Sequence, residues 1–104
     1  MNWNTPNKQQ LVQAFLSLET ADEVKRFLRD LLTESEIDEF TKRFQAAEML
    51  AAKVPYTQIE KETGLSSTTI ARVSKYLAGK EAGYAAVLKK LSHHPSPQKR
   101  RGVS

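Results

Sequence analysis

The sequence contains no cysteine, and this absence removes several classes of function at once. Disulfide-stapled scaffolds, cysteine-ligated zinc or iron–sulfur sites and thiol catalysis all need that residue. Long apolar runs are also missing, so we expect no membrane-spanning helix and no membrane partner. The first ten residues, MNWNTPNKQQ, hold no apolar stretch, so no signal peptide is expected. These absences favour a cytoplasmic protein without a metal site.

Residues suited to catalysis are equally scarce. The two histidines, His93 and His94, are adjacent near the C-terminus, so the predicted folded region has no histidine for general-base chemistry. The four glycines are scattered and form no phosphate-binding loop. The acidic residues at positions 34, 36, 38 and 39 lie near a predicted helix start, where they favour the helix dipole. We therefore expect no catalytic residues and no enzyme activity.

Glycine and proline are rare, with four of each in 104 residues, and neither occurs between residues 7 and 54. No segment alternates apolar and polar residues as a strand would, so the sequence predicts an all-α fold. The length allows one small domain. We place this domain at residues 1–91. The polar and basic remainder, residues 92–104, is expected to be a disordered tail.

Six helices are predicted from apolar spacing and from residues that cap helix ends. Thr20 with Glu23, and Thr33 with Glu36, have the spacing of capping boxes, in which each side chain satisfies a free backbone amide. Gly79 is expected to end the fifth helix. The helices are predicted over residues 7–18, from the Thr20 cap to 31, from the Thr33 cap to 53, over 56–63, from a cap at Ser66 or Ser67 to 77, and over 81–91.

Charge is distributed unevenly along the chain, whose formal net charge is +4. Residues 19–39 hold eight acidic and three basic side chains, whereas residues 40–91 hold nine basic and four acidic ones. A basic region of this kind suits an anionic partner such as nucleic acid. Ordinary scatter of surface charge is the alternative, and charge by itself does not separate the two.

The most informative segment, about residues 56–77, has the pattern of a helix-turn-helix. Gly64 stands at the predicted turn, where a left-handed backbone conformation is needed. Five residues are spaced so that they pack the two helices together: Ile59, Thr63, Leu65, Ile70 and Val73.

The opposite face of the second helix is small, hydroxylic or basic, with no acidic residue. It comprises Ser66, Ser67, Thr68, Ala71, Arg72 and Lys75. Small hydroxyl side chains at a helix start suit base edges and phosphates, and Arg72 and Lys75 suit phosphates or, for Arg72, a guanine edge. The segment therefore predicts a helix that reads the major groove of double-stranded DNA. A helical hairpin that only packs, or a protein-interaction module that no longer binds DNA, is the alternative.

Three segments resemble the Trp repressor family, and more closely its YerC/YecD-type branch. They are LLTE at residues 31–34, RFQAAEML at 43–50, and residues 56–79, within a resemblance that covers roughly residues 10–91. The resemblance implies an all-α, six-helix domain and an intertwined homodimer that presents two helix-turn-helix motifs to a palindromic site. It further implies a transcriptional regulator, and it places these residues at the DNA: Thr57, Lys61, Ser67, Thr68, Thr69 and Ala71.

The resemblance also points to an effector pocket between the long third helix and the second helix of the motif. Leu32, Arg43, Thr69 and Arg72 match residue types that contact tryptophan in the Trp repressor. Two positions depart, because Val73 replaces a glycine and Tyr76 replaces a serine, and both add bulk where the ligand lies. We therefore do not carry tryptophan sensing over and expect no cofactor. L-tryptophan or another small effector is the alternative.

Overall fold

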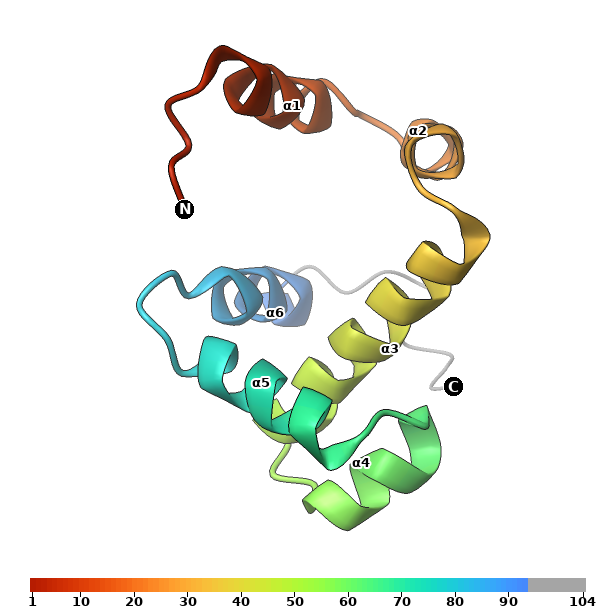
Figure 1. The fold of residues 1–104 in the computed structure, drawn as a ribbon, viewed down its shortest axis with the longest axis vertical. Coiled ribbons are helices and arrows are strands. Elements are labelled where there is room, and N and C mark those ends of the chain that lie inside the picture. Colours follow the sequence, from red (N-terminus) through yellow and green to blue (C-terminus); the bar gives the residue numbers. More distant parts are fainter. Residues whose placement is uncertain (94–104) are drawn as a thin grey trace. The chain divides into compact units, whose positions relative to one another are not determined.

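The computed structural model describes residues 1–93, and all regular structure in that part of the chain is helical (Figure 1). The all-α, six-helix prediction is confirmed for these residues. The helices are α1 (Pro6–Leu16), α2 (Ala21–Leu31), α3 (Glu34–Ala51), α4 (Tyr56–Thr63), α5 (Ser67–Leu77) and α6 (Gly83–His93).

The predicted capping box at Thr33 and Glu36 forms in full, and the one at Thr20 and Glu23 forms in part. The Thr33 side chain accepts from the Glu36 amide at 3.1 Å, and the Glu36 carboxylate accepts from the Thr33 amide at 2.9 Å. The Thr20 hydroxyl likewise accepts from the Glu23 amide at 3.1 Å. The carboxylate of Glu23, however, accepts from the amide of Glu19, one residue before the cap.

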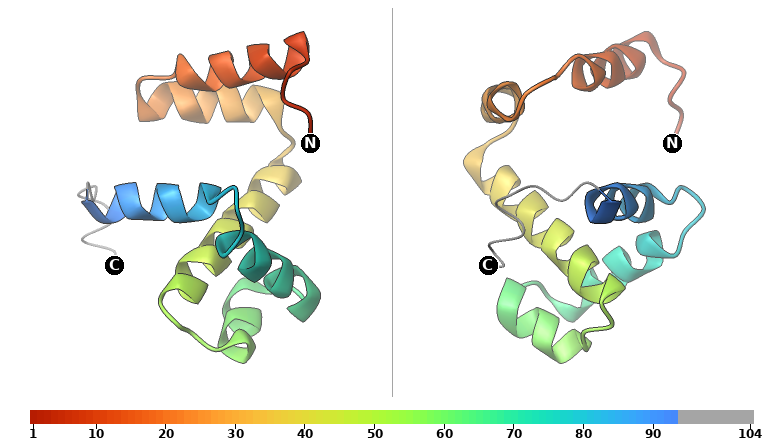
Figure 2. Two further views of the ribbon diagram at one scale, coloured as in Figure 1. Left: turned by 90° about the vertical axis from the view of Figure 1, so that its left-hand side faces the viewer. Right: turned by 180° about the vertical axis from the view of Figure 1, so that it is seen from behind.

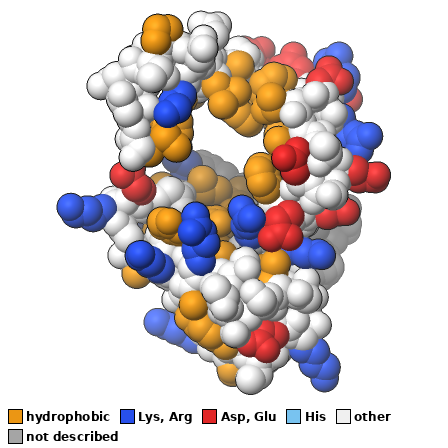
Figure 3. Space-filling model, in the orientation of Figure 1, with side chains coloured by type: hydrophobic (Ala, Val, Ile, Leu, Met, Phe, Trp, Pro, Cys, Tyr) orange, Lys and Arg blue, Asp and Glu red, His pale blue; other side chains and the backbone are white. Residues whose placement is uncertain are grey.

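The chain divides into two compact units, an N-terminal unit (Met1–Ile37) and a C-terminal unit that begins at Asp38. In the N-terminal unit, α1 and α2 run in opposite directions (Figure 2). Their rings Phe15 and Phe27 meet edge to face, with centroids 5.3 Å apart. Neither α1 nor α2 contains a buried residue. The apolar side chains of this unit are open on the face shown in Figure 3.

The C-terminal unit contains the buried core. Its buried apolar residues come from α3, from α4, from the turn that follows α4, and from α5: Ala46, Ala47, Ile59, Leu65, Ile70 and Val73. Tyr84 and Leu88 of α6 pack against this cluster, as do Met49, Leu50 and Val54. The two alanines of α3 are fully buried, and their small side chains let the other helices come close.

Several helix ends depart from the predictions. α1 ends at Leu16 instead of residue 18, and two other ends differ where the backbone enters an unusual conformation. Lys53 has φ 67°, and α3 ends two residues before it, at Ala51. Ala82 has φ 54°, so α6 begins at Gly83 instead of residue 81. It continues to His93, so Ser92 and His93 belong to a helix and not to the predicted tail. Residues 94–104, the rest of that tail, lie outside the described part of the chain.

Gly79 has a different role from the one expected. α5 ends at Leu77, and Ala78 is its C-cap residue. Within the described residues the left-handed glycine is Gly64, not Gly79. A Cβ at Gly79 would lie 3.2 Å from the Lys75 carbonyl oxygen. Glycine therefore suits this position because the backbone of α5 is close.

Candidate nucleic-acid interface

α4 and α5 lie side by side and are joined by a turn at Gly64–Ser66, the arrangement of a helix-turn-helix (Figures 1 and 2). Gly64 caps α4 with φ 76°, and its amide donates to the Glu60 carbonyl at 2.9 Å. No atom lies within 4 Å of a Cβ built on Gly64. The backbone conformation, not a lack of space, is therefore what requires glycine here.

The five predicted packing residues all lie in the interior. Ile59 and Ile70 are fully buried, and Val73, Leu65 and Thr63 are at most 7% exposed. The interpretation of these positions as the contact between the two helices is confirmed. The motif therefore rests on a close-packed core, which holds the outer face of α5 in one orientation.

Thr63 has a polar role that its place in the apolar pattern does not reveal. Its hydroxyl donates to the Ile59 carbonyl at 2.7 Å and accepts from the Leu65 amide at 3.1 Å. Both hydrogen bonds are buried, so water does not compete for these groups, and the two bonds stabilise the conformation of the turn. The sequence does contain a signal for this role. Thr63 ends its helix directly before Gly64, and a threonine hydroxyl at such a position can bond to nearby backbone groups.

The N-cap of α5 is Ser66, which settles a choice that the sequence left open. The Ser66 hydroxyl accepts from the Thr69 amide at 3.1 Å and donates to the Thr69 hydroxyl at 3.1 Å. Ser67 and Thr68, which follow it, form no hydrogen bonds through their side chains to the described residues. Two hydroxyls in the first turn of α5 are thus available to an outside partner.

The structure exposes most of the predicted DNA-contact residues. These exposed residues are Thr57 and Lys61 on α4, the cap residue Ser66, and Ser67, Thr68, Ala71, Arg72 and Lys75 on α5. Thr69 is half-buried because it packs beneath the cap. Lys and Arg side chains gather over α5 on the face drawn in Figure 3.

Arg72 and Arg43 differ in their surroundings. The Arg72 guanidinium lies over the Tyr76 ring, 5.0 Å from its centroid. Its side chain forms no hydrogen bond or ion pair with the described residues. The Arg43 guanidinium pairs with the Glu39 carboxylate at 3.3 Å and lies 5.9 Å from the centroid of the Phe40 ring. Unlike the charge of Arg43, the positive charge of Arg72 is not balanced by a carboxylate of the described residues.

The predicted effector residues are spread over both units. Leu32 is the C-cap residue of α2 in the N-terminal unit, and it is half-buried. Val73 is 2% exposed and belongs to the core. Arg43 and Arg72 are exposed, and Thr69 is half-buried.

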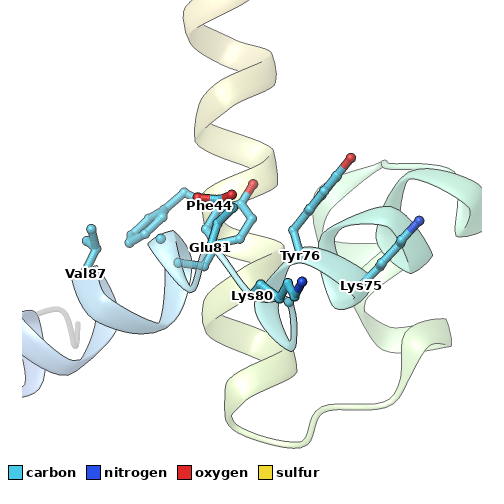
Figure 4. A pocket seen from close by; sticks show the side chains of 9 residues that line it. Phe44, Lys75, Tyr76, Lys80, Glu81 and Val87 are labelled. Carbon is cyan, nitrogen blue, oxygen red and sulfur yellow. The ribbon is translucent and has the colours of Figure 1, made fainter. Parts of the chain in front are cut away.

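An open apolar groove of about 800 Å³ lies within the C-terminal unit. Figure 4 shows Phe44 of α3, Tyr76 of α5 and Val87 of α6 around it, with Lys75, Lys80 and Glu81 at its edge. Gly79, Gly83 and Tyr84 complete the lining. Among the six predicted effector residues, Tyr76 is the one that lines this groove. No local pattern in the sequence shows that Phe44 and Val87 line one groove, because they come from helices far apart in the chain.

Residues 1–93 contain no cluster of three or more acidic or histidine side chains placed to hold a metal ion. No helix among these residues is both long and apolar enough to cross a membrane.

Comparison with known proteins gives concordant matches. The family model described as "Trp repressor protein" matches residues 7–92. The uncharacterized protein YerC of Bacillus subtilis (strain 168) is 43% identical over 68 residues, which span 65% of this chain and 65% of that protein. A TrpR-like protein from Eubacterium eligens ATCC 27750 has a solved structure with a TM-score of 0.80 and 38% identity, covering 86% of this chain and 93% of that one. A putative Trp repressor from Staphylococcus aureus has a TM-score of 0.81 and 32% identity, covering 88% and 95%.

Proposed function

Since this chain belongs to the Trp repressor family, we propose that it is a sequence-specific DNA-binding transcriptional regulator, and specifically a repressor acting in the cytoplasm. The family is regulatory and not enzymatic, which agrees with the lack of a catalytic constellation in the sequence. One observation carries the proposal. A helix with an acid-free, exposed outer face stands on a fully packed core, with its N-terminal turn open to a partner.

The residues of this face suit the two tasks that a DNA reader has. Arg72, Lys75 and Lys61 are exposed cations that would neutralise phosphates, with Arg72 also able to reach a guanine edge. Ser67 and Thr68 have the hydroxyls that would set base preference at the start of α5. Ser66 contributes by fixing that start, because its hydroxyl is engaged in the cap. The remaining contacts are assigned to Thr57, Thr69 and Ala71.

We propose that the regulator acts as an intertwined homodimer on a palindromic site. The support is the apolar surface of the N-terminal unit, where Leu11, Val12, Phe15 and Leu16 are all exposed in the single chain. Water-exposed apolar surface of this extent favours association. A two-fold dimer presents two copies of α5, so the half-sites should lie about one turn of DNA, roughly 34 Å, apart.

We propose further that DNA binding needs no tryptophan. Val73 fills its position in the core, and the Tyr76 ring already lies against Arg72. A ligand that entered between these side chains would have to displace one of them. L-tryptophan added to the binding assay tests this point directly, because a rise in affinity would contradict it.

The proposal is tested by measuring affinity for random duplex DNA over a range of salt concentrations, followed by selection of bound sequences. We expect a palindromic consensus and a linear fall of log affinity with log salt, since bound phosphates release counterions. Arg72→Ala should weaken binding and lower the salt slope by about one. Arg26→Ala is the matched control, because Arg26 pairs with Asp22 on the outside of α2. Absence of binding at every salt concentration would favour a protein-interaction module.

A further inference from the structure

The contact between Arg72 and Tyr76 stands out on the outer side of α5. The two residues are four apart in the same helix, so their side chains share one face. The guanidinium carbon lies 5.0 Å from the ring centroid, within the range of a cation–π interaction. The Arg72 side chain forms no hydrogen bond or ion pair with the described residues, so its N–H groups stay available to an acceptor.

Arg43, in the same unit, is an arginine that lies near a ring and is also paired with a carboxylate. The ring is that of Phe40, and the Arg43 Nε is 3.3 Å from the Glu39 carboxylate. That pair balances the charge of Arg43 and occupies part of its donor edge. Arg72 has the ring without the carboxylate, so no carboxylate of the described residues balances its charge or occupies its donors.

Tyr76 is partly covered by the rest of the chain. The residue is 45% exposed, and with Phe44 it lines the apolar groove (Figure 4). Tyr84 lines the same groove. A tyrosine ring turns about only two side-chain torsions, so it offers the arginine a more constant surface than a flexible side chain would. A long arginine side chain otherwise loses many rotamers when a partner orders it, and this loss weakens binding.

We propose that Tyr76 is a positioning residue for DNA binding: its ring holds the Arg72 guanidinium outward from α5, ready for a phosphate or a guanine edge. The inference rests on the proposed DNA-binding function and adds a residue that the DNA-contact assignments leave out. Tyr76 touches no DNA in this proposal. It acts through Arg72. The ring limits the conformations of the free arginine side chain, so less conformational entropy is lost when DNA binds.

A double-mutant cycle with the full chain and random duplex DNA at low salt tests the proposal. Tyr76→Leu keeps an apolar side chain in the groove and removes the ring. It should lower affinity by about two- to fivefold in the wild type and leave affinity unchanged in the Arg72→Ala background. Tyr76→Phe keeps the ring and should retain wild-type affinity, because the hydroxyl is not needed. Circular dichroism and the melting temperature of each variant show whether it is folded.

Tyr84→Leu is the matched control, because Tyr84 lines the same groove without an arginine against its ring. Its effect on affinity should be equal with and without Arg72. The proposal is overturned if Tyr76→Leu binds like the wild type, or if it weakens binding equally in both backgrounds, as a purely structural role would. These outcomes leave the DNA-binding function intact. If the wild-type chain binds no DNA, the proposed function fails and this inference fails with it.

Discussion

The N-terminal unit and the C-terminal unit use apolar residues in opposite ways. α1 and α2 contain large apolar side chains, yet none of them is buried, and Leu16 is 71% exposed. In the C-terminal unit, α4 and α5 bury Ile59 and Ile70 completely, although both helices are mostly polar by sequence. The number of apolar residues in a helix therefore does not show whether that helix finds its packing partner within the same chain.

This difference separates two roles. The C-terminal unit has a core of its own, so it can hold the outer face of α5 rigid. The N-terminal unit has apolar surface that is exposed in the single chain, and in the proposed dimer a second copy of the chain would cover it. Covering a large apolar side chain is worth about 1.5–3 kcal/mol, so a few such residues suffice to favour association. Four substitutions, each paired with a control, test this comparison in order of decreasing effect.

Truncation within the core should have the largest effect. Ile70→Ala removes a fully buried side chain and leaves a cavity, so we expect a loss of about 2–5 kcal/mol in the free energy of unfolding, measured with urea. Lys61→Ala, at an exposed position on α4, should change it by less than about 0.5 kcal/mol. An equal response of the two variants would show that α4 and α5 are not packed as described.

A charge on the exposed apolar surface of α1 should act on association. Phe15→Glu places a carboxylate beside Phe27 on the surface assigned to the partner, so the dissociation constant of the dimer should rise about ten- to hundredfold. Sedimentation over a concentration series measures it. Gln13→Glu adds the same charge about 160° further around α1 and should leave the constant unchanged. Unchanged sedimentation of both variants would remove this surface from the interface.

A substitution of Gly64 should destabilise the turn between α4 and α5, because the backbone there has a left-handed conformation. Gly64→Ala introduces a Cβ at φ 76° and should cost about 1–2 kcal/mol in the C-terminal unit. Gly83→Ala is the control, because Gly83 is equally uncrowded and does not have a positive φ. Its stability should be unchanged or slightly higher. Thermal unfolding distinguishes the two, and a tolerated Gly64→Ala would contradict a left-handed turn.

The smallest predicted effect is a gain in stability. Lys53 follows α3 with φ 67°, a conformation that is unfavourable for a residue with a Cβ. Lys53→Gly should raise the unfolding free energy by about 0.5–1 kcal/mol, since the relief of strain exceeds the added freedom of the unfolded chain. Lys42→Gly, inside α3, should instead lower it by about 1 kcal/mol. A loss in both variants would show that Lys53 is not strained.

Much of the helix-turn-helix could be predicted from the sequence. The turn at Gly64, the five packing residues and the two capping boxes depend on spacings of at most a few residues, or on the helical period. The predictions were wrong where a single residue took an unusual conformation, as at the start of α6 beside Ala82. No sequence rule places an alanine at positive φ, because the surrounding chain imposes it.

The all-α class, the helix caps and the polarity of the two faces of α5 could be read from the sequence, because each depends on local contacts and on the helical period. The three-dimensional packing was needed to show which apolar residues are buried, that Phe44 and Val87 line one groove, and that the Tyr76 ring lies against Arg72. The physical reason is that burial depends on segments far apart in the chain coming together. A side chain's own neighbours in sequence do not specify which distant segment will cover it.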